Sequence, residues 1–276
     1  MLVQGDGRIV SAVRAVLVDL DGVVYAGERA LPGAAEFFAT LQRLGVAYAF
    51  LTNNTTRTPE HYAARLAQLG IAVDRAQIVT AAEAAAGVVA RERPGARVYV
   101  IGEDGLRSAF QRRGFVLTGE AADYVVVGLD RSFDYEKLRL GTAAIRRGAQ
   151  FVASNADALL PTDDDFVPGA GAMVGALVGA TGVAPRVIGK PKPDMLLLAL
   201  EPLGVLPREA MMIGDRLDTD IAAGRAAGMY TALVLSGVAR AEDLPAAPVQ
   251  PDLVAEHLGA LASVFARYRG EGARAE

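Results

Sequence analysis

The stretch RAVLVDLDG, residues 14–22, passes from a run of apolar residues into two aspartates and a glycine. A continuous apolar run is typical of a strand that is covered on both faces, as in the parallel sheet of an α/β protein. Asp19 and Asp21 then stand where this strand ends, and Gly22 suits the turn that follows. The segment therefore predicts a buried first strand with carboxylates at its C-terminal end.

Strand-like and helical patterns alternate along the rest of the chain. Residues 33–44 have the apolar spacing of a helix, and Gly45 after them is a common helix end. A strand over 46–51 and a helix over 59–69 repeat this pair. Further strands are predicted at 97–101, 124–127, 149–154, 186–188, 210–213 and 231–235, and further helices at 194–203 and 219–227. The alternation predicts a parallel sheet covered by helices.

The composition is that of a globular protein. The 276 residues are 52% hydrophobic and 22% charged, which fits one large domain or two modest ones and argues against disorder. The formal net charge of −4 gives no basic surface for nucleic acid, so we expect no nucleic-acid partner. The chain has no cysteine, which excludes disulfides, thiolate catalysis and cysteine metal sites.

Two segments bear on the location of the protein. Residues 1–14 lack the continuous apolar core of a signal peptide, and we expect a cytoplasmic protein. Residues 166–184 carry no charge and have nearly the length of a membrane span. They are rich in glycine and poor in large aliphatic residues, so we predict a helix packed closely on a neighbouring helix, and no membrane contact.

Three predicted strands end in polar residues. Asp19 and Asp21 end the first strand, residues 52–54 (Thr-Asn-Asn) end the second, and Asp215 follows the strand over 210–213. Ligands of open parallel sheets bind beyond the carboxyl ends of the strands, so these residues are expected to converge. Two carboxylates brought close together need a counterion, and Mg²⁺ prefers such oxygen ligands. We therefore predict a magnesium site.

Each of these motifs also has a purely structural interpretation. Asp19, Asp21 and Gly22 could be the polar edge of a strand and its turn, and residues 52–54 could cap the helix that begins near Pro59. Lys190 follows a glycine, but no glycine-rich loop with the spacing of a nucleotide-binding motif precedes it. Lys190 is therefore interpreted as a single positive charge beside a short strand.

Taken together, the motifs resemble those of a known family. The segments DLDGVVY (19–25), LTNN (51–54), GKP (189–191) and GDRLDTDI (214–221) are similar, in this order, to the four motifs of haloacid dehalogenase (HAD) superfamily phosphatases. More closely, the chain resembles the capped branch that holds 4-nitrophenylphosphatases, phosphoglycolate phosphatases, pyridoxal phosphate phosphatases and nucleotide monophosphatases. The resemblance extends from Val16 to about Val238.

The resemblance implies an α/β fold with a Rossmann-like, doubly wound parallel-sheet core and an inserted α/β cap domain. It implies that residues 1–82 and 187–276 form the catalytic core and that residues 83–186 form the cap. A cap-mediated homodimer is a further expectation from the family. The second set of strands in the sequence then belongs to the cap.

The resemblance also implies roles for the residues of the motifs. Asp19 would be the nucleophile that forms an aspartyl-phosphate, and Asp21 would be the general acid and then the general base. Asp19, the backbone carbonyl of Asp21 and Asp215 would hold Mg²⁺. Asp220 would orient Lys190 or a metal-bound water. Residues expected to bind the phosphate group are Gly22, Thr52, Asn53, Asn54 and Lys190.

The expected function is hydrolysis of a small phosphomonoester, with the substrate open. A nucleotide monophosphate, phosphoglycolate, a sugar phosphate and 4-nitrophenyl phosphate are all compatible with the motifs. Cap residues that could contact the substrate beyond its phosphate are Asp130, Arg131, Asn155 and Asp157. Alternatives on the same fold are a phosphotransferase or mutase and a catalytically idle sensor of phosphorylated metabolites. A receiver domain of a signalling system would use similar residues in a much shorter chain.

Overall fold

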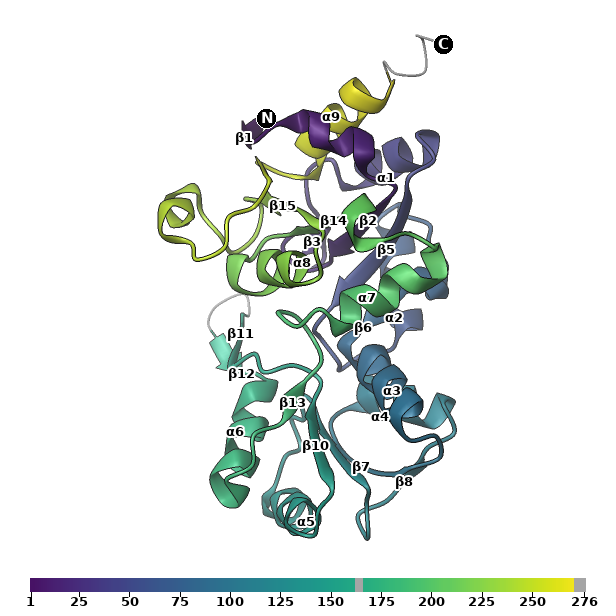
Figure 1. The fold of residues 1–276 in the computed structure, drawn as a ribbon, viewed down its shortest axis with the longest axis vertical. Coiled ribbons are helices and arrows are strands. Elements are labelled where there is room, and N and C mark those ends of the chain that lie inside the picture. Colours follow the sequence, from purple (N-terminus) through teal and green to yellow (C-terminus); the bar gives the residue numbers. More distant parts are fainter. Residues whose placement is uncertain (162–165, 271–276) are drawn as a thin grey trace. The chain divides into compact units, whose positions relative to one another are not determined.

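The computed structural model describes residues 1–161 and 166–270, which fall into two compact units. The first unit comprises Met1–Thr52, Ala63–Ile78 and the segment that begins at Lys190. The second comprises Asn53–Tyr62 and Val79–Gly189. Figure 1 shows the helices and strands of both units with their labels. Both units consist of a sheet with helices packed on it, which confirms the predicted α/β fold class.

The first unit is built on a seven-stranded sheet in the order β1-β16-β15-β14-β2-β5-β6. The predicted first strand is β2 (Ala15–Asp19), and it pairs in parallel with β14 (Ala210–Gly214) and with β5 (Ala47–Thr52). The other strands are β15 (Tyr230–Val234), β16 (Leu253–Ala255), β1 (Leu2–Gln4) and β6 (Ile78–Thr80), of which β6 has only its first residue in this unit. Every residue of β2 and β14 is buried, as expected for strands covered on both faces.

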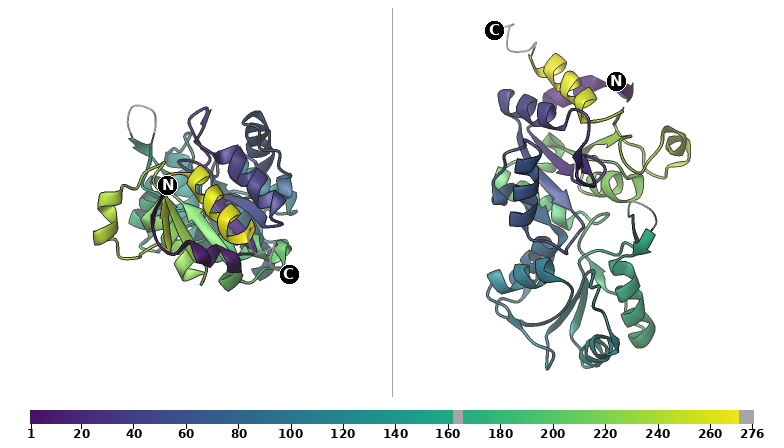
Figure 2. Two further views of the ribbon diagram at one scale, coloured as in Figure 1. Left: turned by 90° about the horizontal axis from the view of Figure 1, so that it is seen from above. Right: turned by 180° about the vertical axis from the view of Figure 1, so that it is seen from behind.

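Two helices of the first unit pack on each other through aromatic side chains. The helices of this unit are α1 (Ala34–Arg43), α7 (Asp194–Leu200), α8 (Ala222–Ala226) and α9 (Leu258–Gly270), and α2 (Pro59–Gln68) has its C-terminal part here. The ring of Phe37 on α1 meets that of Phe265 on α9 edge to face, with centroids 5.7 Å apart. In Figure 2, α9 is the yellow helix that lies along α1. Gly33 lies at this contact, since a Cβ there would lie 2.2 Å from the Cα of Gly259.

Short elements connect these strands and helices. A small hairpin of β3 (Tyr25–Ala26) and β4 (Arg29–Ala30) follows the first strand. The 3₁₀ helices are Gly7–Ala12, Arg75–Gln77, Glu201–Leu203, Pro207–Glu209 and Ala241–Ala246. The helix predicted over 219–227 is divided: Leu217–Ile221 forms a π-helical turn, and α8 follows it. The wide turn is held by Asp220, whose Oδ2 accepts a hydrogen bond from the backbone N–H of Arg216 at 3.1 Å.

The second unit contains a five-stranded parallel sheet in the order β13-β10-β9-β7-β8. Its strands are β7 (Arg97–Ile101), β8 (Val116–Leu117), β9 (Tyr124–Val127), β10 (Gln150–Ala153) and β13 (Arg186–Val187). Its helices are α3 (Ala81–Glu92), α4 (Asp104–Arg112), α5 (Tyr135–Arg146) and α6 (Ala170–Thr181). A two-stranded ribbon of β11 (Leu159–Pro161) and β12 (Phe166–Pro168) precedes α6. All four β-branched or aromatic residues of β9 are buried, which fits its central position in the sheet.

The uncharged segment 166–184 contains a strand, β12, and a helix, α6, and the helix packs on α5. Leu177 of α6 contributes to the core of the second unit. The glycine that lets the two helices approach is Gly141 on α5, because a Cβ there would lie 2.9 Å from a methyl group of Leu177. By contrast, Cβ atoms at Gly175 and Gly179 of α6 would meet open space, so these glycines are not the packing residues that we expected. Within the described part of the chain, every helix is too short or too polar to cross a bilayer.

Candidate active site

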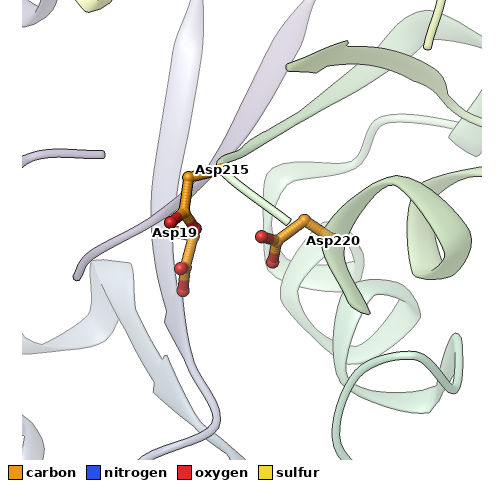
Figure 3. Close-up of side chains that lie close together, drawn as sticks. All are labelled: Asp19, Asp215 and Asp220. Atoms are coloured by element: carbon orange, nitrogen blue, oxygen red, sulfur yellow. The ribbon is translucent and has the colours of Figure 1, made fainter. Parts of the chain in front are cut away.

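The ends of two neighbouring strands bring the carboxylates of the first unit together. Asp19 is the last residue of β2, and Asp215 directly follows β14, which pairs with β2 in parallel. Asp220 comes from the π-helical turn behind β14. Figure 3 shows the three side chains pointing toward one another. One carboxylate oxygen from each lies within 4.8 Å of the others, and all three side chains are buried.

A single ammonium group lies among these carboxylates. The Nζ of Lys190 donates hydrogen bonds to Oδ1 of Asp19 and to Oδ1 of Asp220, both at 2.6 Å. Burial alone would lower the pKa of Lys190, but the two carboxylates outweigh it and raise this pKa above its ordinary value. Lys190 is therefore charged at neutral pH. Three carboxylates against one ammonium still leave an excess of negative charge.

This excess appears in the protonation of the aspartates. Burial, followed by the charge of Asp220, raises the pKa of Asp215 to about 7. Burial also raises the pKa of Asp19 well above its ordinary value, although Lys190 acts in the opposite direction. Carboxylates that resist ionisation in a buried cluster are stabilised in their charged form by a nearby cation. The cluster is thus electrostatically suited to a bound cation.

The free oxygen of Asp215 also suits a metal ion. Its Oδ2 accepts a hydrogen bond from the backbone N–H of Val238 at 2.7 Å. Its Oδ1 is buried and has no hydrogen-bond partner among the described residues. A buried acceptor without a partner is costly, and a metal ligand is one way to satisfy it. Since the donor atoms of the cluster are all carboxylate oxygens, the cation they fit is a hard divalent one.

Gly22 allows the loop after β2 to approach Asp215. Its φ of +79° lies in the left-handed region, and a Cβ there would lie 2.4 Å from Oδ2 of Asp215. The same oxygen leaves no room for a side chain at Gly237, where a Cβ would lie 1.9 Å away. Ser236 connects the two loops, because its Oγ donates a hydrogen bond to the carbonyl oxygen of Gly22 at 2.8 Å. The loop over 236–238 was not predicted as part of the site, although it follows β15 at the same sheet edge as Asp215.

Asp21 lies two residues beyond the end of β2 and reaches solvent, outside the three-carboxylate cluster. Loss of surrounding water raises the pKa of Asp21, and the charges of Arg65 and Lys190 lower it by less. Arg65 was also missed in the sequence. Its guanidinium lies over the ring of Tyr25, 4.0 Å from the centroid, and donates to the carbonyl oxygen of Gly27. A lone arginine on a helix carries no sequence signal for such a contact.

Thr52 is buried at the end of β5, next to β2 in the sheet, so the first unit places it at the same edge as Asp19. Asn53 and Asn54 follow directly but belong to the second unit. The Oδ1 of Asn54 accepts hydrogen bonds from the backbone N–H of Thr56 at 3.0 Å and from its Oγ1 at 2.8 Å. This contact is typical of an Asx turn, which is a structural role for Asn54. Its contact with phosphate stays a prediction.

The candidate cap residues make internal contacts in the second unit. Asp130 is buried and forms an ion pair with Lys137, with Oδ2 and Nζ 2.7 Å apart. Arg131 donates to both carboxylate oxygens of Glu103 at 3.0 Å. The Nδ2 of Asn155 donates to the carbonyl oxygen of Asn53 at 2.7 Å, and Oδ2 of Asp157 accepts from Nδ2 of Asn53 at 3.1 Å. These side chains thus have partners within the second unit, and their contact with a substrate stays a prediction.

Comparison with known sequences places the chain in a family. A sequence model of haloacid dehalogenase-like hydrolases matches residues 16–116, and a second model of HAD-like hydrolases matches residues 187–261. The 5'-nucleotidase YutF of Bacillus subtilis is 43% identical over 83% of this chain and 89% of its own length. An acid sugar phosphatase of Staphylococcus aureus is 40% identical over 86% of this chain and 92% of its own length.

Solved structures agree with these relatives. The 4-nitrophenylphosphatase of Thermotoga maritima has a TM-score of 0.89 and 33% identity, covering 92% of this chain and 98% of its own. A double mutant of a thermostable NPPase of Geobacillus stearothermophilus has a TM-score of 0.85 and 39% identity, covering 90% of this chain and 98% of its own. Phosphatases of this family generally use a divalent metal ion, which agrees with the carboxylate cluster. The chain therefore belongs to the haloacid dehalogenase-like hydrolases, as a phosphatase whose Rossmann-like core carries an inserted α/β cap.

Proposed function

We propose that this phosphatase is a magnesium-dependent phosphomonoester hydrolase that works through an aspartyl-phosphate on Asp19. The observation that carries the proposal is the buried cluster of Asp19, Asp215 and Asp220 around Lys190, in which Oδ1 of Asp215 lacks a protein partner among the described residues. Asp19, Asp215 and the backbone carbonyl of Asp21 would hold Mg²⁺. The bound ion would offset the negative charge of the phosphoryl oxygens and of the carboxylates.

In the first step, a carboxylate oxygen of Asp19 attacks phosphorus while the bond from phosphorus to the leaving oxygen breaks. Asp21 donates its proton to that oxygen, so the alcohol leaves neutral. The raised pKa of Asp21 supports this role, because it increases the protonated fraction. Lys190, 2.6 Å from Asp19, keeps the nucleophile oriented and adds positive charge beside the transferred group.

In the second step, Asp21 removes a proton from water, and the water oxygen attacks phosphorus. The bond between Asp19 and phosphorus breaks, inorganic phosphate forms, and Asp19 returns as a carboxylate. Thr52 and Asn53 are proposed to donate hydrogen bonds to the phosphoryl oxygens in both steps. Asp220 keeps Lys190 in place through its 2.6 Å hydrogen bond.

For the substrate, we propose a small phosphorylated metabolite. The relatives are named for a nucleotide, for acid sugar phosphates and for 4-nitrophenyl phosphate, which share the phosphate ester and differ beyond it. This diversity agrees with the recognition of the phosphate by core residues, and we propose that a cap over residues 83–186 selects the rest of the substrate. Phosphoglycolate belongs to the same substrate class.

The test is phosphate release from a panel of phosphomonoesters by wild type and by Asp19→Asn, with Mg²⁺ and with EDTA. The panel contains 4-nitrophenyl phosphate, a sugar phosphate, a nucleoside monophosphate and phosphoglycolate. We expect turnover that needs Mg²⁺ and falls at least about 10³-fold in the variant, because the nucleophile is lost. Circular dichroism of the variant controls for folding. Folded wild type that releases no phosphate with Mg²⁺ present would favour the sensor, and transfer to a sugar instead of water would favour the mutase.

A further inference from the structure

The loop after β10 makes a polar contact network with the segment that follows Thr52. The carboxamide of Asn155 is buried, and its Nδ2 donates to the backbone carbonyl of Asn53 at 2.7 Å. The carboxamide Nδ2 of Asn53 in turn donates to Oδ2 of Asp157 at 3.1 Å. Asn53 is therefore held at its main chain by one residue of this loop and at its side chain by another.

The loop is itself rigidly built. The backbone N–H of Asp157 donates to Oδ1 of Asn155 at 3.2 Å, which closes an Asx turn, and the carbonyl of Asp157 accepts from the N–H of Gly171 at 2.9 Å. The second contact ties the turn to the first residues of α6. Both polar atoms of the Asn155 carboxamide are thus used within the protein, Oδ1 on its own turn and Nδ2 on Asn53.

The same loop also contacts the residue before Lys190. The backbone N–H of Gly189 donates to the carbonyl of Ser154 at 2.8 Å. A Cβ at Gly189 would lie 2.6 Å from that carbonyl and 2.6 Å from Oδ1 of Asn53. Residues 53 and 189 are each adjacent in the chain to a proposed phosphate-binding residue, Thr52 and Lys190. The loop over 154–157 therefore contacts Asn53 and Gly189, the chain neighbours of Thr52 and Lys190.

We propose that Asn155 and Asp157 are positioning residues for phosphate binding, which act through Asn53 and Gly189 and not through contact with the substrate. This inference rests on the proposed function and replaces the expectation that the two residues contact the substrate beyond its phosphate. A carboxylate that orients a carboxamide donor reduces the conformations available to it before the phosphate arrives. The cost of losing Asp157 is then the same for every phosphomonoester, because all of them share the phosphate group.

The test compares Asp157→Ala with Asp157→Asn, with Ala156→Ser as a matched control on the exposed position between the two residues. We expect Asp157→Ala to lower kcat/KM about tenfold for 4-nitrophenyl phosphate, a sugar phosphate and a nucleoside monophosphate alike, the loss typical of one charge-assisted hydrogen bond. The inhibition constant of inorganic phosphate should rise in parallel. Asp157→Asn should retain most of the wild-type kcat/KM, since the Oδ1 of asparagine can accept the same hydrogen bond.

Two results would overturn the proposal. If kcat/KM falls for only one of the three phosphomonoesters and the inhibition constant of phosphate is unchanged, Asp157 contacts the part of the substrate beyond its phosphate. An Asp157→Ala protein with wild-type kinetics would mean that the network has no role in binding.

Hydrogen–deuterium exchange separates this proposal from the proposed function. Asp157→Ala should speed amide exchange in the peptide over residues 53–56, and Asp157→Asn and Ala156→Ser should not. If the wild type shows no turnover but the variants show this exchange pattern, the proposed hydrolase function is refuted and the loop contact still holds. Unchanged exchange in Asp157→Ala would refute the positioning role.

Discussion

At the scale of single residues, buried charges keep their ionised form only where a partner supplies the opposite charge. Lys190 has two such partners, and Asp130 of the second unit has one, Lys137. Burial raises the pKa of Asp130, but hydrogen bonds from Lys137 and Ser132 outweigh it and leave the pKa below its ordinary value. The carboxylate therefore stabilises the folded state when it is ionised.

We expect Asp130→Asn to lower the free energy of unfolding by about 1–3 kcal/mol at pH 7, because it leaves the ammonium of Lys137 without its carboxylate. Since the folded pKa of Asp130 lies below its unfolded value of about 3.9, the contribution is complete above that pH and disappears as the pH falls through the folded pKa. Urea denaturation between pH 7 and pH 3 measures the difference. If the difference in the free energy of unfolding between wild type and Asp130→Asn does not decrease in acid, the ionised carboxylate of Asp130 does not have this stabilising role.

A second prediction at this scale concerns Arg65, which lies over Tyr25 and donates to the carbonyl of Gly27. These contacts hold the β3–β4 hairpin that follows Asp21. We expect Arg65→Met to lower kcat several-fold, because the hairpin loses these contacts, and to lower the midpoint of thermal unfolding by only a few degrees, because the cation–π contact is worth about 0.5–2 kcal/mol. Arg65→Lys should retain part of kcat, since an ammonium can also lie over the ring. Equal kcat in Arg65→Met and wild type would exclude this role.

At the scale of elements, the spacing between helices depends on which glycines face a neighbour. On α5, a Cβ at Gly141 would press on Leu177 and on Ile101, whereas on α6 a Cβ at Gly175 would meet open space. Both glycines lie inside helices, where glycine is unfavourable by about 1 kcal/mol relative to alanine. They differ only in what surrounds them.

We therefore expect opposite effects of filling the two positions. Gly175→Ala should raise the free energy of unfolding by about 0.5–1 kcal/mol through helix propensity. Gly141→Val should lower it by about 1–3 kcal/mol, because the added methyl groups overpack the contact between α5 and α6. Chemical denaturation of both variants measures this difference. Destabilisation by Gly175→Ala would show that this face of α6 is covered in solution.

At the scale of the whole molecule, the proposed metal site would make stability depend on a bound cation. A ligand that binds only the folded state stabilises it by mass action, by about 2.7 kcal/mol at a concentration one hundred times its dissociation constant. Burial, and after it the charge of Asp220, disfavour the ionised form of Asp215, as its pKa of about 7 indicates. Metal binding and folding are thereby linked in the proposed function.

We expect Mg²⁺ to raise the midpoint of thermal unfolding of wild type by about 5 °C relative to EDTA, on the usual conversion from free energy to temperature. Asp215→Asn should lose this response. In EDTA the variant should unfold at a temperature equal to or above that of wild type, because one of three buried carboxylates has become neutral. Asp104→Asn, at an exposed position on α4, is the control. If Mg²⁺ still raises the midpoint of thermal unfolding of Asp215→Asn, Asp215 is not a ligand of the metal ion.

The sequence by itself was sufficient for the fold class, for the family and for the existence of three strands near Asp19, Thr52 and Gly214, although the predicted ends of these strands differ from the observed ones by one or two residues. Such strands are readable because apolar periodicity is local and because parallel strands present their carboxyl ends at one edge. The family motifs then predicted Lys190 and Asp220 beside the nucleophile. That prediction came from resemblance, since the spacing of these residues along the chain gives no sign that they meet.

Other features were decided by the tertiary structure. The loop that leaves Gly237 no room for a Cβ beside Asp215, and the hydrogen bonds of Asn155 and Asp157 with Asn53, join residues distant in sequence. The π-helical turn that presents Asp220 is local, but it departs from the regular helix that the apolar spacing predicts. Residue type could not separate a substrate contact from a contact with a neighbouring loop, because both need the same hydrogen-bonding groups. Only the packing of strands and turns determines which partner each side chain reaches.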